Sequence, residues 1–600
     1  MRLQTALSLF TATLGLAADV ETLGIKEPKC KCTPADACWP KDCHWDTLSK
    51  ALGKGKLMKL APIAESCYEG PNKDLTKCAE VAAKWTNQEF ELSHPLGRSY
   101  PYNITCPAVN YAAGEQPTME CILGIQPSYA IKVTERRDIA LAIDFAKRNN
   151  VRLVTTAGGH DLFGRSDGHG ALEIWLHDYT KGINFQKTFK SAKGCTKSGW
   201  TGSAIHIDGA WEWRRVFEVA KANNVIAVGG GSQTPNSIGG WPSGGGHGPA
   251  SRNYGLGADQ ILEAEVMLAD GRIVTANHCE NSDLFSAIRG GGPGYGVVLS
   301  EIIKVYPNVN VVGVHDLKFA PKEDTTDNKE LLDAIATLYT HVPQMVRDGV
   351  AGYGFWFRHY PVAYIGTAKS GYKHTAWTIG QTKEETEAAM APFLAELDQF
   401  KDKLTITSVY REYSDYWAFY FAESGLFDPV GGTSMIASRL INSEAVADYD
   451  KVREAIEVLG GGPTEVSSNV LLMVSGGANF ENAKDQSSGL NPAWRVSPFV
   501  MVAGGGLGNK GYNKAARDAL QYRVTYVKGA ALQKLAPSTG SYMNEGDGGD
   551  PDYIKNYYGA NYGRHLATKK KYDPKNLFYC RTCVGSDEFH DRPWGPLCRV

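Results

Sequence analysis

The feature that most restricts the fold of this chain is a pattern that occurs twice: a strand, an amphipathic helix and a second strand that ends in a glycine-rich turn. The expected elements are 128–132, 134–149 and 151–154 in the first copy, and 204–207, 211–222 and 225–228 in the second. Thr134 carries a hydroxyl that can cap a helix N-terminus, so we expect it to cap the first helix. Strand–helix–strand units of this kind pack into one α/β domain. The two glycine turns are therefore predicted to meet at a single ligand.

The first of these turns carries a histidine, His160, within Ala-Gly-Gly-His-Asp. Glycine lets a large cofactor approach the backbone closely, and free backbone N–H groups can hold phosphate oxygens. A histidine fixed at such a turn is a candidate for direct chemistry with that cofactor. A nicotinamide Rossmann domain is disfavoured, because its glycine turn must lead into a helix, whereas the clusters 229–231 and 292–296 do not. The sequence also lacks a Walker loop and a His-Glu-x-x-His helix, so no metal site is expected.

Length and charge narrow the class of protein further. A chain of 600 residues exceeds one ordinary core, which predicts two or more domains. The formal net charge is −2 with mixed signs throughout, so no surface for nucleic acid or for an anionic membrane is expected. Beyond the N-terminus, no segment has about 18 uninterrupted apolar residues, so no membrane span is expected either.

The N-terminus is typical of a secretory signal peptide. Arg2 precedes a short apolar run over 3–16, and small residues around Ala17 and Ala18 offer a cleavage site. We therefore expect a secreted, extracellular protein. The sequon at Asn103, Asn-Ile-Thr, is a predicted glycosylation acceptor and agrees with export.

Cysteine usage agrees with an oxidising compartment. Six of the 13 cysteines lie between Cys30 and Cys78, in a stretch of broken periodicity that we expect to be disulfide-stapled and to wrap the body. For Cys580 and Cys583 a disulfide is favoured over a zinc half-site, since no second pair completes a zinc set. The odd count leaves at least one thiol free or otherwise bonded, and the isolated cysteines are Cys195 and Cys279.

The remaining elements predict a hairpin, a helix and a second domain. Apolar runs at 261–268 and 272–275 flank Asp270-Gly271, which favours a hairpin turn. Ser282 is expected to cap a helix over 283–289, and a strand follows at 297–306. Beyond Pro307, helical patterns alternate with aromatic and β-branched runs, which indicates an antiparallel sheet with helices on one side. The helices are expected at 330–342 and 383–400, and the strands at 354–357, 468–475 and 499–502.

A series of motifs between about residues 120 and 585 resembles the FAD-linked oxidases of the vanillyl-alcohol-oxidase superfamily, berberine-bridge-enzyme-like branch. They occur in that branch's order, at 157–166, 238–248, 252–259, 283–292, 542–544 and 572–578. The Cys-rich start, with Cys38-Trp39-Pro40, resembles the fungal secreted group that contains isoamyl alcohol oxidase.

This resemblance implies an α+β fold: a two-part FAD-binding α/β domain of the PCMH type, plus a substrate domain with an antiparallel sheet covered by helices. The expected segments are a signal peptide (1–18), a Cys-rich segment (19–120), the FAD-binding domain (121–309), the substrate domain (310–535) and a C-terminal segment that returns to the FAD domain (536–600). A monomer is expected.

The resemblance also implies FAD held by the two glycine loops and linked covalently to His160. Relatives often add a second bond from a cysteine in Cys-Pro-Thr, but the matching stretch here, 233–236, has none. A monocovalent link is therefore predicted. The expected FAD-binding residues are Thr155, Thr156, Ala157, Gly158, Gly159, His160, Asp161, Ser166, Gly230, Gly231, Gly239, Gly240, Ser243, Gly244, Gly245, Gly246, His247, Gly248, Asn253, Leu256, Asp259, Tyr542 and Asn544.

For catalysis, the resemblance singles out Tyr542 as the base that removes a hydroxyl proton while hydride leaves for the flavin, with Asn544 orienting Tyr542 or the flavin. His247 is the alternative base or a partner of Tyr542. An ordinary tyrosine has a pKa near 10, so Tyr542 would need a neighbouring cation. Glu412 and Asp415 are acidic alternatives.

The expected reaction is oxidation of an alcohol, sugar or secondary metabolite, with molecular oxygen reoxidising the flavin to release hydrogen peroxide. The alternatives are a flavin dehydrogenase or oxidative cyclase of secondary metabolism that uses another acceptor, and a non-catalytic secreted protein that binds flavin or another ligand.

Overall fold

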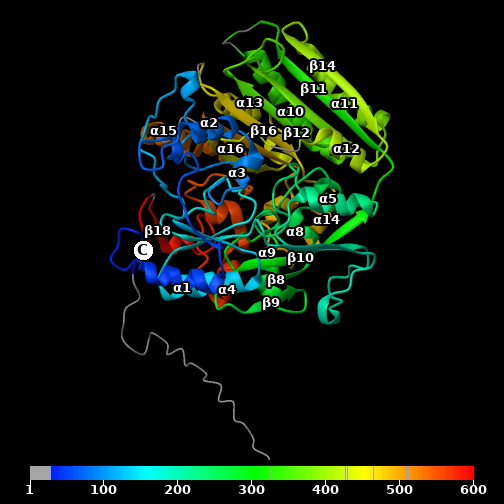
Figure 1. Cartoon of the computed structure of the whole chain (residues 1–600). Helices are drawn as coiled ribbons and strands as arrows, with labels where there is room; N and C mark the ends of the chain where they lie inside the picture. Colours follow the sequence, from blue (N-terminus) through cyan, green and yellow to red (C-terminus); the bar gives the residue numbers. More distant parts are fainter. Residues whose placement is uncertain are drawn as a thin grey trace, which may run out of the picture.

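The computed structural model describes residues 29–323, 325, 328–425, 428, 430–463, 465–508, 513–592 and 594–600. The predicted signal peptide lies outside the described residues. Across these ranges, no helix combines the length and the apolar character that crossing a bilayer requires. The fold has mixed helices and sheets, with a smaller pair of sheets in the lower half of Figure 1 and a large antiparallel sheet in the upper half.

The first strand–helix–strand unit builds a four-stranded sheet. Its strand order is β1-β2-β4-β3, in which β2, β4 and β3 run parallel and β1 pairs antiparallel with β2. α4 connects β2 to β3, and α1 packs beside α4. The Trp45 ring of α1 stacks on Tyr129 of β2, with 3.8 Å between the ring centroids. The elements are α1 (Asp42–Leu52), β1 (Leu57–Lys59), β2 (Tyr129–Lys132), α4 (Arg136–Arg148), β3 (Leu153–Thr156) and β4 (Leu172–Trp175).

The second unit forms too, but its strands do not pair with each other. β6 and β7 both pair antiparallel with the long strand β10, so this second sheet is antiparallel, in the order β5-β6-β10-β8-β9. β8 and β9 form the predicted hairpin. The elements are β5 (Thr180–Gln186), β6 (Ala204–Gly209), α5 (Trp213–Ala222), β7 (Val225–Ala227), α6 (Gly240–Ser243), α7 (Ser251–Tyr254), α8 (Gly257–Gln260), β8 (Ile261–Met267), β9 (Ile273–Asn277), α9 (Ser282–Ile288) and β10 (Val297–Pro307).

The large sheet is antiparallel throughout, in the order β14-β11-β13-β12-β16-β17-β15. Helices α10, α11 and α13 cover one face of it, and Trp356 and Met501 belong to the core between the sheet and these helices. The elements are β11 (Val312–Pro321), α10 (Lys329–Arg347), β12 (Ala351–Arg358), β13 (Gly371–Ile379), α11 (Lys383–Leu397), β14 (Leu404–Tyr413), α12 (Tyr416–Glu423), β15 (Thr433–Ile441), α13 (Tyr449–Gly460), β16 (Ser467–Met473), α14 (Ala478–Glu481), β17 (Phe499–Gly508), α15 (Lys514–Tyr522) and α16 (Ala530–Leu535).

The N-terminal segment contributes α2 (Leu75–Lys84) and α3 (Gln88–Leu92), and the C-terminal segment contributes α17 (Tyr562–Tyr572), β18 (Phe589–Asp591) and β19 (Leu597–Arg599). A disulfide between Cys30 and Cys598 joins these two ends of the chain. Arg98, buried at 3 % exposure, pairs with Asp167 and Glu173 at 3.1 and 3.4 Å and so ties the N-terminal segment to the first sheet.

Several local expectations need correction. The first helix is preceded by Glu135 instead of Thr134, whose hydroxyl contacts the Asp138 carboxylate. Ser282 is the first residue of α9, after Asn281. Cys195 and Cys279 form a disulfide, because the loop after β5 lies beside the end of β9, and the free cysteine is the exposed Cys43.

The structure also bears on two further expectations, a disulfide between Cys580 and Cys583 and glycosylation at Asn103. Cys580 and Cys583 are paired, which confirms the preference for a disulfide there. Asn103 is only 9 % exposed, and the Thr105 hydroxyl of its sequon donates to the Ile122 carbonyl at 2.7 Å. Asn103 therefore lies near the limit of burial, and glycosylation there stays a prediction.

Candidate functional site

His160 lies where three parts of the chain meet. Its Nε2 is 2.9 Å from the Thr234 hydroxyl of the second glycine loop and 3.4 Å from the Gln88 amide of α3. The ring of Tyr100, also from the N-terminal segment, lies edge-on at 6.1 Å. Burial lowers the pKa of His160 to about 4, against the opposing charge of Asp428. The imidazole is therefore neutral at ordinary pH.

The turn before His160 has no room for side chains. Gly159 adopts φ +65°, and a Cβ there would lie 2.8 Å from the Leu92 side chain and 2.9 Å from the Gly97 carbonyl. A Cβ on Gly158 would lie 3.0 Å from the backbone nitrogen of Asn236. The turn is thus clamped between the N-terminal segment and the second glycine loop, and glycine is required at both positions.

A cavity of about 150 Å³ opens beside this turn. Its lining combines residues of the first glycine turn with two arginines and aromatic rings, and the buried Asn236 Oδ1 in its wall has no hydrogen-bond partner among the described residues. Arginines suit phosphate oxygens, and flat rings suit an aromatic base. The residues present therefore fit a nucleotide-bearing cofactor such as FAD. Those that line the cavity include Thr156, Ala157, Gly158, Gly159, Trp175, His177, Trp211, Arg214, Arg215 and Asn236.

A second polar cluster surrounds His247. Its Nε2 is 2.8 Å from Glu545 Oε1, and its Nδ1 is 3.1 Å from the hydroxyl of Tyr353 on β12. The Tyr542 ring meets the His247 ring edge-on at 5.4 Å, and the Asn544 amide donates to the Tyr542 hydroxyl at 3.1 Å. The sequence-predicted trio of His247, Tyr542 and Asn544 is thus brought together.

Tyr542 and His247 differ in their electrostatic surroundings. Tyr542 is 1 % exposed, and burial raises its pKa above the ordinary value, with the Glu545 charge adding to the rise. Arg165 and the Asn544 hydrogen bond oppose the rise but do not cancel it. The positive charge of Arg165 therefore does not lower the pKa of Tyr542 enough to make this tyrosine an effective base. His247, by contrast, has a carboxylate on one ring nitrogen and a hydroxyl on the other.

Other predicted residues lie around these two clusters. Asp161 accepts from the backbone N–H of Phe163 and pairs with Arg165, and the Ser166 carbonyl accepts from Arg98. A Cβ on Gly231 would lie 2.7 Å from the Tyr353 hydroxyl, and one on Gly244 would overlap the Asn544 amide. Thr155 and Thr156 are the last two residues of β3. The Gly230 carbonyl accepts from the Tyr420 hydroxyl, and the Gly239 N–H donates to the Glu301 carboxylate. Gly240 and Ser243 are the first and last residues of α6, and the loop continues with Gly245, Gly246 and Gly248.

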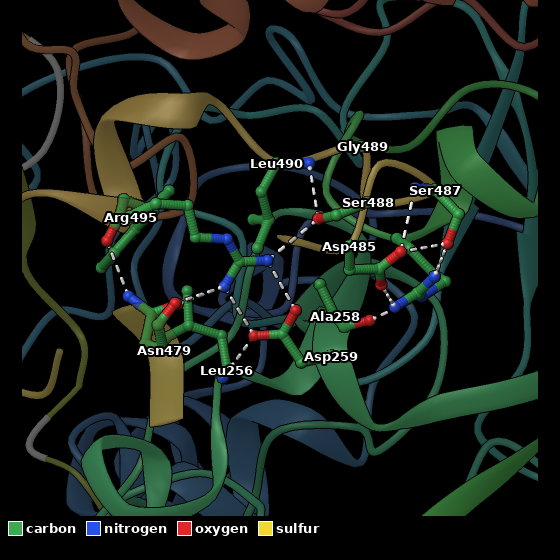
Figure 2. A network of polar contacts seen from close by, with 12 residues as sticks. Leu256, Ala258, Asp259, Asn479, Asp485, Ser487, Ser488, Gly489, Leu490 and Arg495 are labelled. Atoms are coloured by element: carbon green, nitrogen blue, oxygen red, sulfur yellow. Dashed lines mark hydrogen bonds and ion pairs between the residues drawn. The ribbon is translucent and has the colours of Figure 1, made fainter. Parts of the chain in front are cut away.

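Asn253, Leu256 and Asp259 are engaged elsewhere. Asp259 accepts from the Leu256 N–H at 3.0 Å and pairs with Arg495, as Figure 2 shows. The Asn253 amide donates to the Ile379 carbonyl of the large sheet. These contacts join the two halves of the molecule, and none of them reaches His160.

Two acidic alternatives are likewise engaged in local structure. Glu412 accepts from the backbone N–H of Lys383 at the start of α11. Asp415 caps α12, where it accepts from Trp417 and Ala418. Both carboxylates are thus engaged at helix N-termini, and among the described residues neither has a hydrogen bond to His247, Tyr542 or Asn544. Within the described ranges, no group of three or more His, Cys, Asp or Glu side chains could hold a metal ion.

Sequence reasoning missed three residues of the site: Gln88, Thr234 and Glu545. Glu545 directly follows the Tyr-x-Asn motif, so its position was a usable signal. Gln88 comes from the Cys-rich segment, and nothing local marks it. Tyr353 lies on β12, in the aromatic-rich sequence of the second domain. Only the tertiary contacts bring these residues to the two histidines.

Comparison with known proteins gives consistent matches. Residues 127–277 match the family model described as FAD binding domain, and residues 541–585 match the one described as berberine and berberine like. FAD-linked oxidoreductase hmp9 of Hypomyces subiculosus is 57% identical over 572 residues, 95% of this chain and 91% of that protein. FAD-linked oxidoreductase apf9 of Gibberella fujikuroi is 36% identical, over 95% of this chain and 97% of that protein.

A solved structure is similar over nearly the whole chain. The VAO-type flavoprotein MtVAO713 from Myceliophthora thermophila C1 is 64% identical, with a TM-score of 0.94 over 96% of this chain and 100% of that chain. The FAD-binding domain and the antiparallel-sheet domain are thus found together in a solved flavoprotein.

Proposed function

Because the chain belongs to the FAD-linked oxidoreductases of the vanillyl-alcohol-oxidase superfamily, berberine-bridge-enzyme-like branch, we propose that it oxidises a CH–OH group and passes the electrons to molecular oxygen. FAD, when bound, accepts the hydride from the substrate carbon and is reoxidised with release of hydrogen peroxide. The observation that carries this proposal is the His247–Glu545 pair, 2.8 Å apart and beside Tyr542 and Asn544. The substrate classes considered are alcohols, sugars and secondary metabolites.

His160 is proposed as the single covalent attachment point of FAD. Its neutral imidazole is consistent with a nucleophilic nitrogen, since only an unprotonated nitrogen has a free lone pair. Thr234 belongs to the stretch 233–236, which has no cysteine, and its hydroxyl contacts His160. Cys195 and Cys279 are bonded to each other, so neither is available for the flavin.

His247 is proposed as the general base. A carboxylate on Nε2 fixes the proton there, so Nδ1 keeps a lone pair that accepts from the Tyr353 hydroxyl. The substrate hydroxyl can then give its proton to Tyr353, which passes its own proton to Nδ1. Tyr542, whose raised pKa keeps it protonated, orients the substrate as a hydrogen-bond donor together with Asn544.

The test is a comparison of His247→Gln, Glu545→Gln and Tyr542→Phe, with His590→Gln on the exposed strand β18 as a control. Substrates are first found by assaying peroxide across alcohols, sugars and secondary metabolites. Anaerobic flavin reduction is then followed by stopped flow. His247→Gln is expected to slow reduction about 10²-fold or more. Glu545→Gln removes a charged hydrogen bond and is expected to cost about 10- to 100-fold.

Three results would contradict the proposal. A larger loss in Tyr542→Phe than in His247→Gln would return the base to Tyr542. Flavin reduction without peroxide formation would favour a dehydrogenase or an oxidative cyclase that uses another acceptor. A purified protein that is colourless would remove the flavoenzyme altogether and leave a binding protein.

We also propose that the protein is exported. The six disulfides among the described residues support this, because such bonds persist in oxidising compartments. Expression with the native N-terminus should release the protein into the medium with residues 1–18 removed, which N-terminal sequencing of the secreted protein checks.

A further inference from the structure

We propose that the substrate carries a flat, apolar body, such as two fused aromatic rings, beside the hydroxyl that is oxidised, and that Phe355 and Val470 select this body over a sugar. The inference rests on the proposed oxidation at the His247–Glu545 pair, and it names the substrate class for that site. It follows from the face of the large sheet that lies opposite helices α10, α11 and α13.

Side chains on this face form two rows that cross β12, β16, β17 and β15 in the order of the sheet (Figure 1). The first row consists of Tyr353, Leu472, Val500 and Leu440. The second row consists of Phe355, Val470, Val502 and Ser438. On each strand the two members are two residues apart, so they share one face of the sheet. Trp356, which lies between them in β12, belongs to the core on the opposite, helix-covered face.

Both ends of this arrangement reach the proposed catalytic cluster. At one end, the Tyr353 hydroxyl lies 3.1 Å from Nδ1 of His247. At the other end, the Ser438 hydroxyl accepts from the Tyr542 backbone N–H at 3.1 Å and donates to the Tyr542 carbonyl at 3.3 Å. The two rows therefore border the place where the substrate hydroxyl is proposed to react.

The first three members of the second row, Phe355, Val470 and Val502, form what we call the apolar row. Val502 is 4 % exposed and lies in the same hydrophobic cluster as Tyr542. Val470 is only partly buried at the edge of this cluster, and Phe355 is 37 % exposed. Exposure thus increases along the apolar row, which leads from the catalytic cluster to the protein surface.

The dimensions of the apolar row suit a flat body of about two rings. Neighbouring strands lie about 4.8 Å apart, so three strands give a strip about 10 Å long. The strip offers one aromatic ring and the methyl groups of two valines. A fused ring system placed on it removes apolar surface of both partners from water and can pack against the Phe355 ring.

The polar side chains beside these rows do not suit a sugar. The Thr375 hydroxyl of β13, opposite Tyr353, donates to the Asp316 carboxylate at 2.8 Å. The Ser438 hydroxyl is engaged with the backbone of Tyr542. A sugar ring on the apolar row would lose water from its hydroxyl groups without gaining these side chains as partners, which is unfavourable. Polar recognition is instead concentrated at the end that holds His247.

The test measures binding to the purified protein with its cofactor, without turnover. Isothermal titration calorimetry compares 2-naphthylmethanol, a two-ring alcohol, with cellobiose, a disaccharide. We expect cellobiose to bind at least tenfold more weakly. Phe355→Thr removes the ring and should weaken binding of 2-naphthylmethanol about tenfold, as expected for the loss of an aromatic contact. Val470→Thr keeps the shape but adds a hydroxyl to the apolar row, and should weaken binding about three- to tenfold.

Val409→Thr is the matched control. Val409 is 45 % exposed and lies on the edge strand β14, three strands from β12 in the same sheet, so this variant should bind like the unvaried protein. Two row variants keep the test valid if one of them does not fold.

Three results would overturn the inference: no measurable binding of 2-naphthylmethanol, cellobiose binding at least as tightly, or unchanged affinity for 2-naphthylmethanol in the row variants that fold. A protein that binds 2-naphthylmethanol through Phe355 but whose flavin is reduced by no alcohol would support the selection by the apolar row. That result would refute the proposed oxidation instead, so the two proposals fail separately.

Discussion

Removing Arg495 tests whether Asp259 joins the two halves of the molecule or serves the cofactor. The two side chains are 8 and 3 % exposed, and the guanidinium binds both carboxylate oxygens, at 2.7 and 2.9 Å. Arg495 also donates to the Asn479 carbonyl and the Ser488 hydroxyl, each at 3.1 Å (Figure 2). We expect Arg495→Met to destabilise the folded state strongly.

The magnitude follows from the charge that is left behind. Burial by itself raises the pKa of Asp259, but the charge and hydrogen bonds of Arg495 outweigh it and hold the pKa below its ordinary value. Without Arg495, an unpaired buried carboxylate costs about 3–5 kcal/mol. At about 2 °C per kcal/mol, the melting temperature falls by about 6–10 °C. The difference in melting temperature between Arg495→Met and the unvaried protein narrows as pH falls from 7 to 4, because protonation then neutralises the unpaired Asp259 carboxylate in the variant.

The assay is thermal unfolding of the full chain, followed by tryptophan fluorescence, with covalent flavin measured per folded molecule. Arg148→Met is the control, since Arg148 pairs with Asp144 on the surface and should cost less than about 1 kcal/mol. Covalent flavin is expected to stay unchanged in Arg495→Met and in Asp259→Asn. A melting shift under about 2 °C, or a loss of flavin without a melting shift, would refute the structural role and restore Asp259 as a cofactor residue.

Two further predictions concern pH and disulfides. Burial raises the pKa of Glu301 to about 8 from an ordinary 4.5. The folded state therefore holds this proton more tightly than the unfolded chain and loses stability as pH rises from about 4.5 through 8. Glu301→Gln should reduce the fall in melting temperature between pH 5 and 9, and an unchanged fall would contradict the raised pKa of Glu301. Native protein should react with one equivalent of a thiol reagent, at Cys43, and two or more reactive thiols would contradict the cysteine pairing. The double variant Cys195→Ser with Cys279→Ser should lose about 2–4 kcal/mol of stability in denaturant unfolding.

The free cysteine illustrates why some features escape local reasoning. The odd count in the sequence required an unpaired thiol, but Cys195 and Cys279 looked isolated only along the chain. The loop after β5 and the end of β9 are brought together by pairing through β6, β10 and β8, which spacing does not reveal. The same limit applies to Asn103, whose sequon is visible in the sequence and whose burial is not.

The sequence by itself determined the family, the two strand–helix–strand units and the glycine turn that presents His160, because strand and helix periodicity and the absence of a side chain act locally. It also predicted His247, Tyr542 and Asn544 as site residues, through motifs in a fixed order, and the structure brings the three together. Only the tertiary structure decided that Tyr542 is buried with a raised pKa, that His247 has Glu545 and Tyr353 as partners, and that Gln88 reaches His160. Burial and donor–acceptor geometry arise between segments far apart in the chain, and no local pattern records them.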